Sequence, residues 1–198
     1  MPSKETTQDS TSLSGQGSKE MGKYTGLLNC DQLSEEDFIR EVERRNYNPY
    51  GYDLTLSNQW SRVEPSGKYP FIDSADPSSF ISEHLPAADT VLVPPNDFVL
   101  GCTKETIEVP KDVLGLCFSR SSMVRIGLNV NITPFEAGWK GTVTIEIFNA
   151  SRFPILVHAD QKIGQVIFLR GLKPSIDYVS KGGRYQGQEG LVGSKGVT

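Results

Sequence analysis

The stretch GTVTIEIFN, residues 141–149, alternates between apolar and polar side chains with a period of two. Successive side chains of a β-strand point to opposite faces, so Val143, Ile145 and Ile147 share one face, and Thr144 and Glu146 share the other. The first set is made of β-branched residues, which favour strands and pack well in a core. The stretch therefore predicts a half-buried strand whose second face carries a carboxylate.

Similar apolar runs lie on both sides of this strand, separated by turn residues. The chain has 12 prolines and 19 glycines to punctuate them. Such a pattern is typical of a mainly β fold, either an antiparallel sandwich, a jelly roll or a distorted barrel. The runs are GYDLTLS (51–57), VLVPPNDFVLGC (91–102), ETIEVPKDVLGLCF (105–118), IGLNVNI (126–132), FPILVHA (153–159) and IGQVIFL (163–169).

One N-terminal helix is predicted over LSEEDFIREVERRN, residues 33–46. Ser34 is a suitable N-cap, and Asp37 follows three residues later, as in a capping box. The dipeptide Asn48-Pro49 would end the helix because a residue before proline disfavours the α conformation.

The two ends of the chain differ in composition from the middle. Residues 1–24 contain few large aliphatic side chains, which predicts a disordered tail ahead of a β domain over 25–182. Residues 183–198 are rich in glycine, which fits either a second disordered tail or a lid that opens and closes. No run resembles a secretory signal or a membrane span, so we expect a cytoplasmic protein without a membrane partner.

Charge and cysteine usage narrow the classes of function. Residues 1–110 carry 9 Lys/Arg against 18 Asp/Glu, whereas residues 111–198 carry 11 against 6, so an anion site is expected in the second half. Long basic runs are absent from the sequence, which argues against a nucleic-acid partner. Three widely spaced cysteines and two histidines do not form the ligand pattern of a zinc site.

Three polar groups within strands or turns are candidates for chemistry. The insert SRSSMVRIG, residues 119–127, could form a turn and a short helix whose amides and Arg120 bind phosphate, or it could be an ordinary surface cluster. Glu146 could be a solvated strand residue or a proton acceptor in a pocket. Gln165 interrupts an apolar strand, where its amide could bind backbone or the edge of a ligand.

Five motifs taken together are more specific than any one of them. In their order and separation they resemble the successive motifs of the dCTP deaminase and dUTPase superfamily, over roughly residues 28 to 192 and closest to the deaminase branch. The motifs are GYDLTL, SRSSMVRIGL, NITPFEAGWKGTVTIEIFN, KIGQVIF and GGRYQGQEG. The resemblance implies a dUTPase-like distorted jelly-roll barrel, with residues 183–198 closing over the ligand as a C-terminal lid.

The resemblance also implies a reaction and an assembly. The reaction is hydrolytic deamination of dCTP to dUTP and ammonia, without zinc and with Mg²⁺ carried by the nucleotide triphosphate. The assembly is a homotrimer whose sites lie at the subunit interfaces and bind dCTP or dUTP.

Residue roles follow by matching motifs. Glu146 matches the proton shuttle, and Ser121 and Arg125 match the groups that hold the attacking water and the catalytic carboxylate. Ile132 and Phe135 belong to the segment that lines the base and sugar, where Phe135 could exclude a 2′-hydroxyl. The nucleotide-binding set that the resemblance implies is Arg120, Ser121, Ser122, Arg125, Ile132, Phe135, Thr144, Ile145, Glu146, Gln165, Tyr178, Arg184 and Gln188, with no residue assigned to a metal.

Two other functions remain open from the sequence. In a dUTP diphosphatase or a bifunctional enzyme that forms dUMP, the corresponding turn carries an aspartate that activates water. In this chain the turn reads TPFEAGW, and its only carboxylate is Glu136. A non-catalytic, regulatory trimer that binds nucleotides would keep the fold without the reaction.

Overall fold

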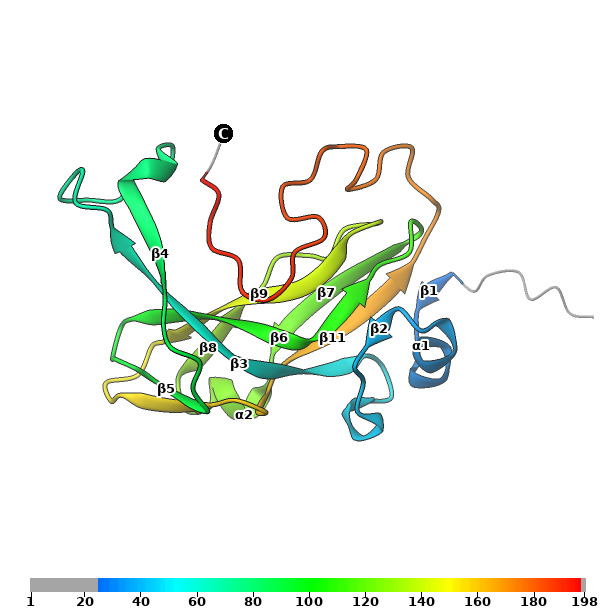
Figure 1. The fold of residues 1–198 in the computed structure, drawn as a ribbon. Coiled ribbons are helices and arrows are strands. Elements are labelled where there is room, and N and C mark those ends of the chain that lie inside the picture. The colour runs from blue at the N-terminus through cyan, green and yellow to red at the C-terminus, as the bar shows by residue number, and fades with distance from the viewer. Residues whose placement is uncertain (1–24, 197–198) are drawn as a thin grey trace, which may run out of the picture.

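The computed structural model describes residues 25–196 and consists mainly of β-strands (Figure 1). Within this range the chain forms eleven strands and two α-helices. The mainly β, jelly-roll-like fold expected from the sequence is confirmed. The predicted disordered tail, residues 1–24, lies outside the described residues.

A nine-stranded antiparallel sheet forms the body of the molecule (Figure 1). Six strands follow one another in the order β1 (Gly26–Leu27), β11 (Lys162–Arg170), β3 (Tyr52–Pro65), β6 (Phe98–Glu108), β9 (Lys140–Asn149) and β8 (Leu128–Asn131). Three more strands pair off this path: β2 (Ile39–Arg40) with β6, β4 (Phe80–His84) with β3, and β7 (Val113–Ser119) with β11. A separate two-stranded sheet joins β5 (Thr90–Val93) to β10 (Ile155–His158).

The alternation expected in β9 is confirmed. Val143, Ile145 and Ile147 are buried in the main core, whereas Thr144 and Glu146 on the other face are partly exposed. Burial of the apolar face fixes the register, because a shift of one residue would turn every side chain to the wrong side. The position of Glu146 on the outer face is therefore set by the core on the inner face.

A bulge interrupts the pairing of β6 with β9 between Cys102 and Thr106. Side chains fill the gap in the ladder: the Thr103 hydroxyl accepts from the Val143 amide at 2.9 Å, and the Glu105 carboxylate accepts from the Thr55 amide of β3 at 2.9 Å. Only 1% of Glu105 is exposed, and this burial raises the pKa of its carboxyl group.

The predicted N-terminal helix exists, but its boundaries are wrong. Helix α1 spans Cys30–Glu36, where Asn29 and Gln32 form a reciprocal capping box with bonds of 3.0 and 2.9 Å, and it ends at Asp37 in a left-handed conformation. Asn29 caps one turn before Ser34, so Ser34 lies inside the helix. The rest of the predicted helix, residues 37–46, is not α-helical: Ile39–Arg40 form the strand β2, and a 3-10 turn follows at Arg44–Asn46.

A short helix, α2 (Ser121–Val124), follows β7, as expected for the Arg/Ser insert. Gly127 then turns the chain into β8 with a φ of 85°, where a Cβ would stand 2.9 Å from that of Ser151. Only glycine tolerates both the angle and the close approach. This turn brings β8 alongside β9 and so places the insert next to the strand that carries Glu146.

Candidate active site

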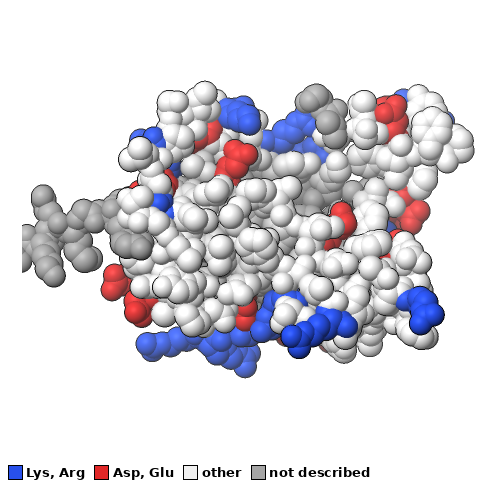
Figure 2. All heavy atoms as spheres, turned by 180° about the vertical axis from the view of Figure 1, so that it is seen from behind, with Lys and Arg blue, Asp and Glu red and all other residues white. Residues whose placement is uncertain are grey.

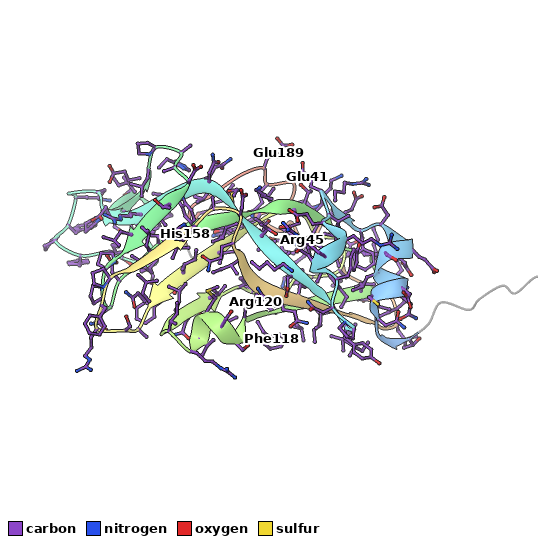
Figure 3. The ribbon with its side chains drawn as sticks, turned by 90° about the horizontal axis from the view of Figure 1, so that it is seen from below. Glu41, Arg45, Phe118, Arg120, His158 and Glu189 are labelled. Atoms are coloured by element: carbon purple, nitrogen blue, oxygen red, sulfur yellow. The ribbon has the colours of Figure 1, made fainter. Side chains whose placement is uncertain are left out.

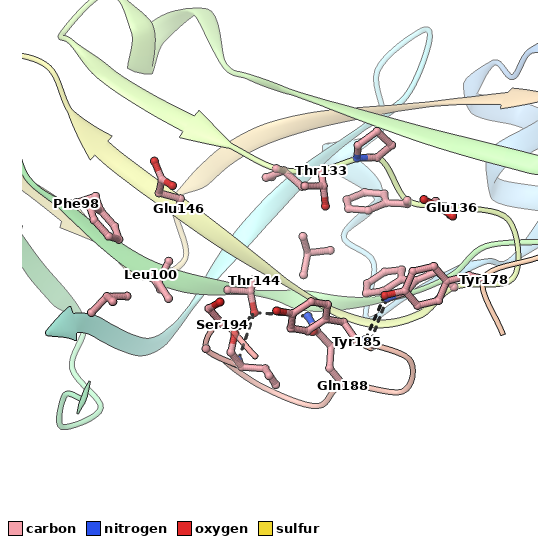
Figure 4. Close-up of a pocket in the computed structure, with 18 residues that line it drawn as sticks. Phe98, Leu100, Thr133, Glu136, Thr144, Glu146, Tyr178, Tyr185, Gln188 and Ser194 are labelled. Carbon is pink, nitrogen blue, oxygen red and sulfur yellow. Dashed lines mark hydrogen bonds between the residues drawn. The ribbon is translucent and has the colours of Figure 1, made fainter. Parts of the chain in front are cut away.

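A cavity of about 610 Å³ lies where β9, the turn before it and the C-terminal segment meet (Figure 4). Its size suits a nucleoside-sized ligand. Six of the predicted site residues line it, namely Ile132, Phe135, Thr144, Glu146, Tyr178 and Gln188. The other lining residues are Val63, Phe98, Leu100, Thr133, Pro134, Glu136, Trp139, Val143, Tyr185, Val192, Gly193 and Ser194.

Glu146 stands in a wall that this cavity shares with a second hollow. The second hollow has a volume of about 470 Å³ and is lined by Glu146 together with residues of β7 and β8, including Ser119 and Asn131. Asn131 pairs with Glu146 across the two strands, and its amide Nδ2 donates to the carboxylate Oε1 at 2.8 Å. In Figure 4 the carboxylate points away from the C-terminal segment that carries Tyr185 and Gln188.

Thr144, two residues before Glu146, is tied to the C-terminal segment. Its hydroxyl accepts from the Val192 amide and donates to the Val192 carbonyl, both at 3.2 Å. The Gln188 amide donates to the Thr142 carbonyl, and the Leu191 amide donates to the Gln59 side chain at 3.0 Å. Residues 188–192 therefore lie along β9 as a cover for the cavity.

An aromatic wall closes the other end of the cavity. The Trp139 indole donates to the Tyr185 carbonyl at 3.0 Å, and the Tyr185 amide donates to the Tyr178 hydroxyl at 3.1 Å (Figure 4). Phe135 stacks on Trp139 with ring centroids 5.5 Å apart and an interplanar angle of 17°. The turn of residues 133–139 is thus held against the YQGQ motif, residues 185–188, by the bond from Trp139 to Tyr185.

The Arg/Ser insert lies outside this cavity. Ser121, Ser122 and Arg125 are exposed on α2. The Arg120 guanidinium instead lies 3.3 Å from Asp53, a nearly buried carboxylate that Lys162 also approaches at 3.4 Å. Figure 3 shows Arg120 close to α2.

Three other predicted residues have different surroundings. Gln165 lies on β11 opposite Phe118, and its amide donates to the Tyr50 carbonyl at 3.0 Å. The side chain of Ile145 is fully buried in the core, on the face of β9 opposite Glu146. Arg184 donates to the Gly196 carbonyl within the C-terminal segment.

The cavity wall has the wrong charge for phosphate. Among the lining residues that the structure describes, Glu136 and Glu146 are acidic and none is Lys, Arg or His. Figure 2 shows, on the face seen from behind, that Lys and Arg lie mostly along the lower and upper edges and leave a largely uncharged middle. A polyphosphate in the cavity would need cations from elsewhere, because an uncompensated anion beside carboxylates is strongly disfavoured.

The second hollow contributes a thiol. Burial raises the pKa of Cys117 to about 12, so this group is neutral at physiological pH. Within residues 25–196, no group of three or more His, Cys, Asp or Glu side chains is placed to hold a metal ion. Neither helix in this range has the length and apolar content needed to cross a bilayer.

Several lining residues were missed from the sequence. Asn131 carried a signal, since it alternates with Val130 in a predicted strand and faces the same side as Glu146. Val63 and Ser194 carried no such signal, because they line one cavity only through the way β3, which pairs with β4, and the C-terminal segment lie in the fold.

Comparison with known proteins gives a consistent result. A family model described as dCTP deaminase-like matches residues 29–171. The chain is 38% identical over 165 residues to a dCTP deaminase of Acidobacterium capsulatum, which covers 82% of this chain and 88% of the relative. It is 36% identical over 163 residues to a dCTP deaminase of Campylobacter concisus, covering 81% of this chain and 86% of the relative.

A solved structure shares the fold. The crystal structure of 2′-deoxycytidine 5′-triphosphate deaminase from Agrobacterium tumefaciens superposes with a TM-score of 0.59 and 18% identity, over 74% of this chain and 48% of that one. The family model spans most of the β domain, and the curated relatives extend over most of the chain. The protein belongs to the dCTP deaminase-like family.

Proposed function

We propose that the protein hydrolyses the C4–N bond of the cytosine in dCTP and releases dUTP and ammonia. The observation that carries this proposal is the position of Glu146, a carboxylate in the wall of a nucleoside-sized cavity, on the strand that the family motif assigns to the proton shuttle. Relatives named dCTP deaminase, 36–39% identical to this chain, support the same substrate.

In the proposed reaction Glu146 acts as both base and acid. It takes a proton from water as the oxygen attacks C4, and it delivers that proton to N3 of the ring. A second proton passes from the added hydroxyl to the amino group, which leaves as ammonia. The carboxylate ends in its starting form, so one side chain in hydrogen-bond reach serves every step.

The base would lie between apolar and aromatic side chains. Ile132 and Phe135 belong to the segment that the family resemblance assigns to base and sugar, and both line the cavity. Tyr178 and Gln188 line it as well, and Thr144 stands beside Glu146 on β9. Exclusion of water by these groups strengthens each electrostatic contact with the reacting ring.

The phosphates would be bound by residues from two places. Within the chain, Arg184 lies on the C-terminal segment that covers the cavity and is part of the predicted lid. The remaining groups would come from a second copy in a homotrimer. Its Arg120 and Ser122 would contact the phosphates, and its Ser121 and Arg125 would hold the attacking water and the Glu146 carboxylate. The cation-free cavity supports this arrangement.

Exposed apolar side chains near α2 also support an assembly. Phe118, Val124 and Ile126 are 56%, 47% and 54% exposed. A cluster of this kind on a single chain is typical of an interface. Gln165 is also predicted to contact nucleotide and would do so with its side chain on β11. Ile145 would do so through its backbone on β9.

The proposal includes Mg²⁺ carried by the triphosphate, since Mg²⁺ is commonly bound through substrate phosphates. It also includes catalysis without zinc, supported by the wide spacing of the cysteines and the scarcity of histidine in the sequence. A cytoplasmic location is proposed on the same sequence grounds, with three free cysteines in agreement.

One observation favours a second activity, hydrolysis at the α-phosphate to give dUMP and pyrophosphate. Glu136, the only carboxylate of the TPFEAGW turn, lines the same cavity as Glu146. It could activate a second water there.

One assay tests both activities. The full-length protein is incubated with dCTP and separately with dUTP, each with Mg²⁺, and ammonia, pyrophosphate and the nucleotides are measured. Ammonia and dUTP formed from dCTP are expected, whereas pyrophosphate would indicate the diphosphatase. Nucleotide binding without either product would point to the non-catalytic alternative and overturn the proposal.

A further inference from the structure

Among the described residues, Asn131 is the only one whose side chain donates a hydrogen bond to Glu146. The two residues are directly opposite each other in the β8–β9 ladder, and the Asn131 amide is the group that donates to the Glu146 carboxylate, at 2.8 Å. The contact involves Oε1, and Oε2 accepts no hydrogen bond within residues 25–196. One carboxylate oxygen is therefore held and the other is available.

Within the described residues, Glu146 has no charged partner beside the neutral amide of Asn131. Its neighbour on the second side of β9 is Leu100 of β6, which is apolar. Besides Glu146, the titratable side chains that line the two hollows are Glu136, Tyr178, Tyr185 and Cys117, and none of the described lining residues is Lys, Arg or His. The amide of Asn131 is thus the polar group of this chain that acts on the carboxylate directly.

We propose that Asn131 is a positioning residue for Glu146: it fixes the rotamer of the carboxylate and leaves Oε2 free to face the attacking water. This inference rests on the proposed deaminase function. Asn131 touches neither water nor base in the proposal and acts only through Glu146.

Two physical effects follow from the contact. The N–H donor bonds to the ionised carboxylate, which is the form that accepts a proton from water. A hydrogen bond between adjacent strands also removes rotamer freedom before substrate binds, which lowers the cost of reaching the reactive geometry.

The test compares three substitutions at Asn131 with one on the same strand. Asn131→Ala removes the donor, Asn131→Asp keeps the shape but adds a negative charge, and Asn131→Gln keeps an amide. Asn129→Ala is the matched control, because Asn129 lies two residues away on the same face and pairs with Phe148.

With the wild type active on dCTP, Asn131→Ala is expected to lower kcat about tenfold with little change in KM. Asn131→Asp should also move the acidic limb of the pH–rate profile upward by about one unit, because the two carboxylates repel. Asn131→Gln should restore part of kcat, and Asn129→Ala should stay within about twofold of wild type.

A wild-type kcat and pH profile in Asn131→Asp would overturn the inference while leaving the deaminase function intact. If the wild type forms no ammonia from dCTP, the proposed function fails, and the contact is decided by NMR of the Asn131 side-chain amide protons. Their chemical shifts should change in Glu146→Ala, which removes the hydrogen-bond acceptor. Unchanged amide shifts would refute the contact.

Discussion

Two regions of the chain carry the polar groups that the sequence singles out, and their chemistry is opposite. The cavity beside β9 is lined mainly by apolar and aromatic side chains, with the carboxylates of Glu136 and Glu146 and no cation among its described lining residues. The region of α2 is open, with exposed hydroxyls at Ser121 and Ser122 and two nearby arginines.

Under the proposed function, neither region is a complete nucleotide site by itself. A triphosphate needs the cations of the second region, and a base needs the walls and the acid of the first. Since one copy keeps the two apart, a symmetric assembly that joins them across an interface is the simplest complete site.

The largest effect is expected from Glu146→Gln. The substitution keeps the size and the hydrogen-bonding shape of the side chain but removes the proton acceptor. Deamination of dCTP should fall by at least about 10²-fold while nucleotide binding persists. Rates by ammonia release and affinity by calorimetry measure the two separately. An unchanged rate would remove Glu146 from the mechanism.

Mixing two inactive variants tests whether the regions work across copies. Arg125→Ala breaks only the α2 region, and Glu146→Gln breaks only the cavity. If each site takes one residue from each of two neighbours in a trimer, subunits exchanged at equal amounts should regain about a quarter of the wild-type activity.

The control for this mixture is a co-refolded sample that carries both substitutions in every chain, which should stay inactive. Light scattering checks that the mixed species is a trimer. Mixed subunits as inactive as their parents would show that both residues act within one chain, contrary to the comparison.

Removal of residues 183–198 should produce a smaller loss. The deletion takes away Arg184, Tyr185 and Gln188 and with them the cover of the cavity, so dCTP affinity should fall by about tenfold or more. A shorter deletion of residues 190–198 keeps the YQGQ motif and should retain more affinity. Equal affinity in all three proteins would favour a plain tail over a lid.

The smallest effect is expected in the sheet that connects the regions, at Glu105. Burial raises the pKa of this carboxyl, so the folded protein favours the protonated form more than the unfolded chain does. This preference adds stability below the unfolded value near 4.5 and is lost as pH rises through the folded value. Glu105→Gln should match wild type within about 1 kcal/mol at acidic pH and become relatively more stable toward neutral pH.

Glu108→Gln at the end of the same strand is the control for this prediction. A hydrogen bond from Lys140 lowers the pKa of Glu108, so its contribution has the opposite sign and is lost as pH falls. Urea unfolding at several pH values measures both variants. Parallel pH dependence of the two would contradict the assignment to burial.

Much of the fold follows from local pattern. The alternation in β9 predicted which side chains enter the core, and it therefore predicted that Glu146 faces outward. Alternating apolar runs and turn residues also predicted most strands, and a short helix was one of the two expectations for the Arg/Ser insert that forms α2. The N-terminal helix was misplaced because two capping boxes were possible within a few residues, and Asn29 with Gln32 forms the real one.

The candidate site was less predictable because it depends on contacts between distant segments. Thr144 and Val192 are hydrogen-bonded although they lie 48 positions apart, and no sequence pattern around either residue predicts this contact. The pairing of Arg120 with Asp53 is similar, since the sequence offered the arginine to phosphate but gave no sign of a buried carboxylate beside it.

The route of the C-terminal segment has a practical consequence for handling the protein. Ser194 lines the cavity and Gly196 lies against Pro77, so the last described residues end beside the mouth of the proposed site. Gly26 in β1 lies at the other end of the sheet (Figure 1). A purification tag fused after Thr198 would crowd the entrance, and one placed before Met1 is the safer choice for crystallography and enzymology.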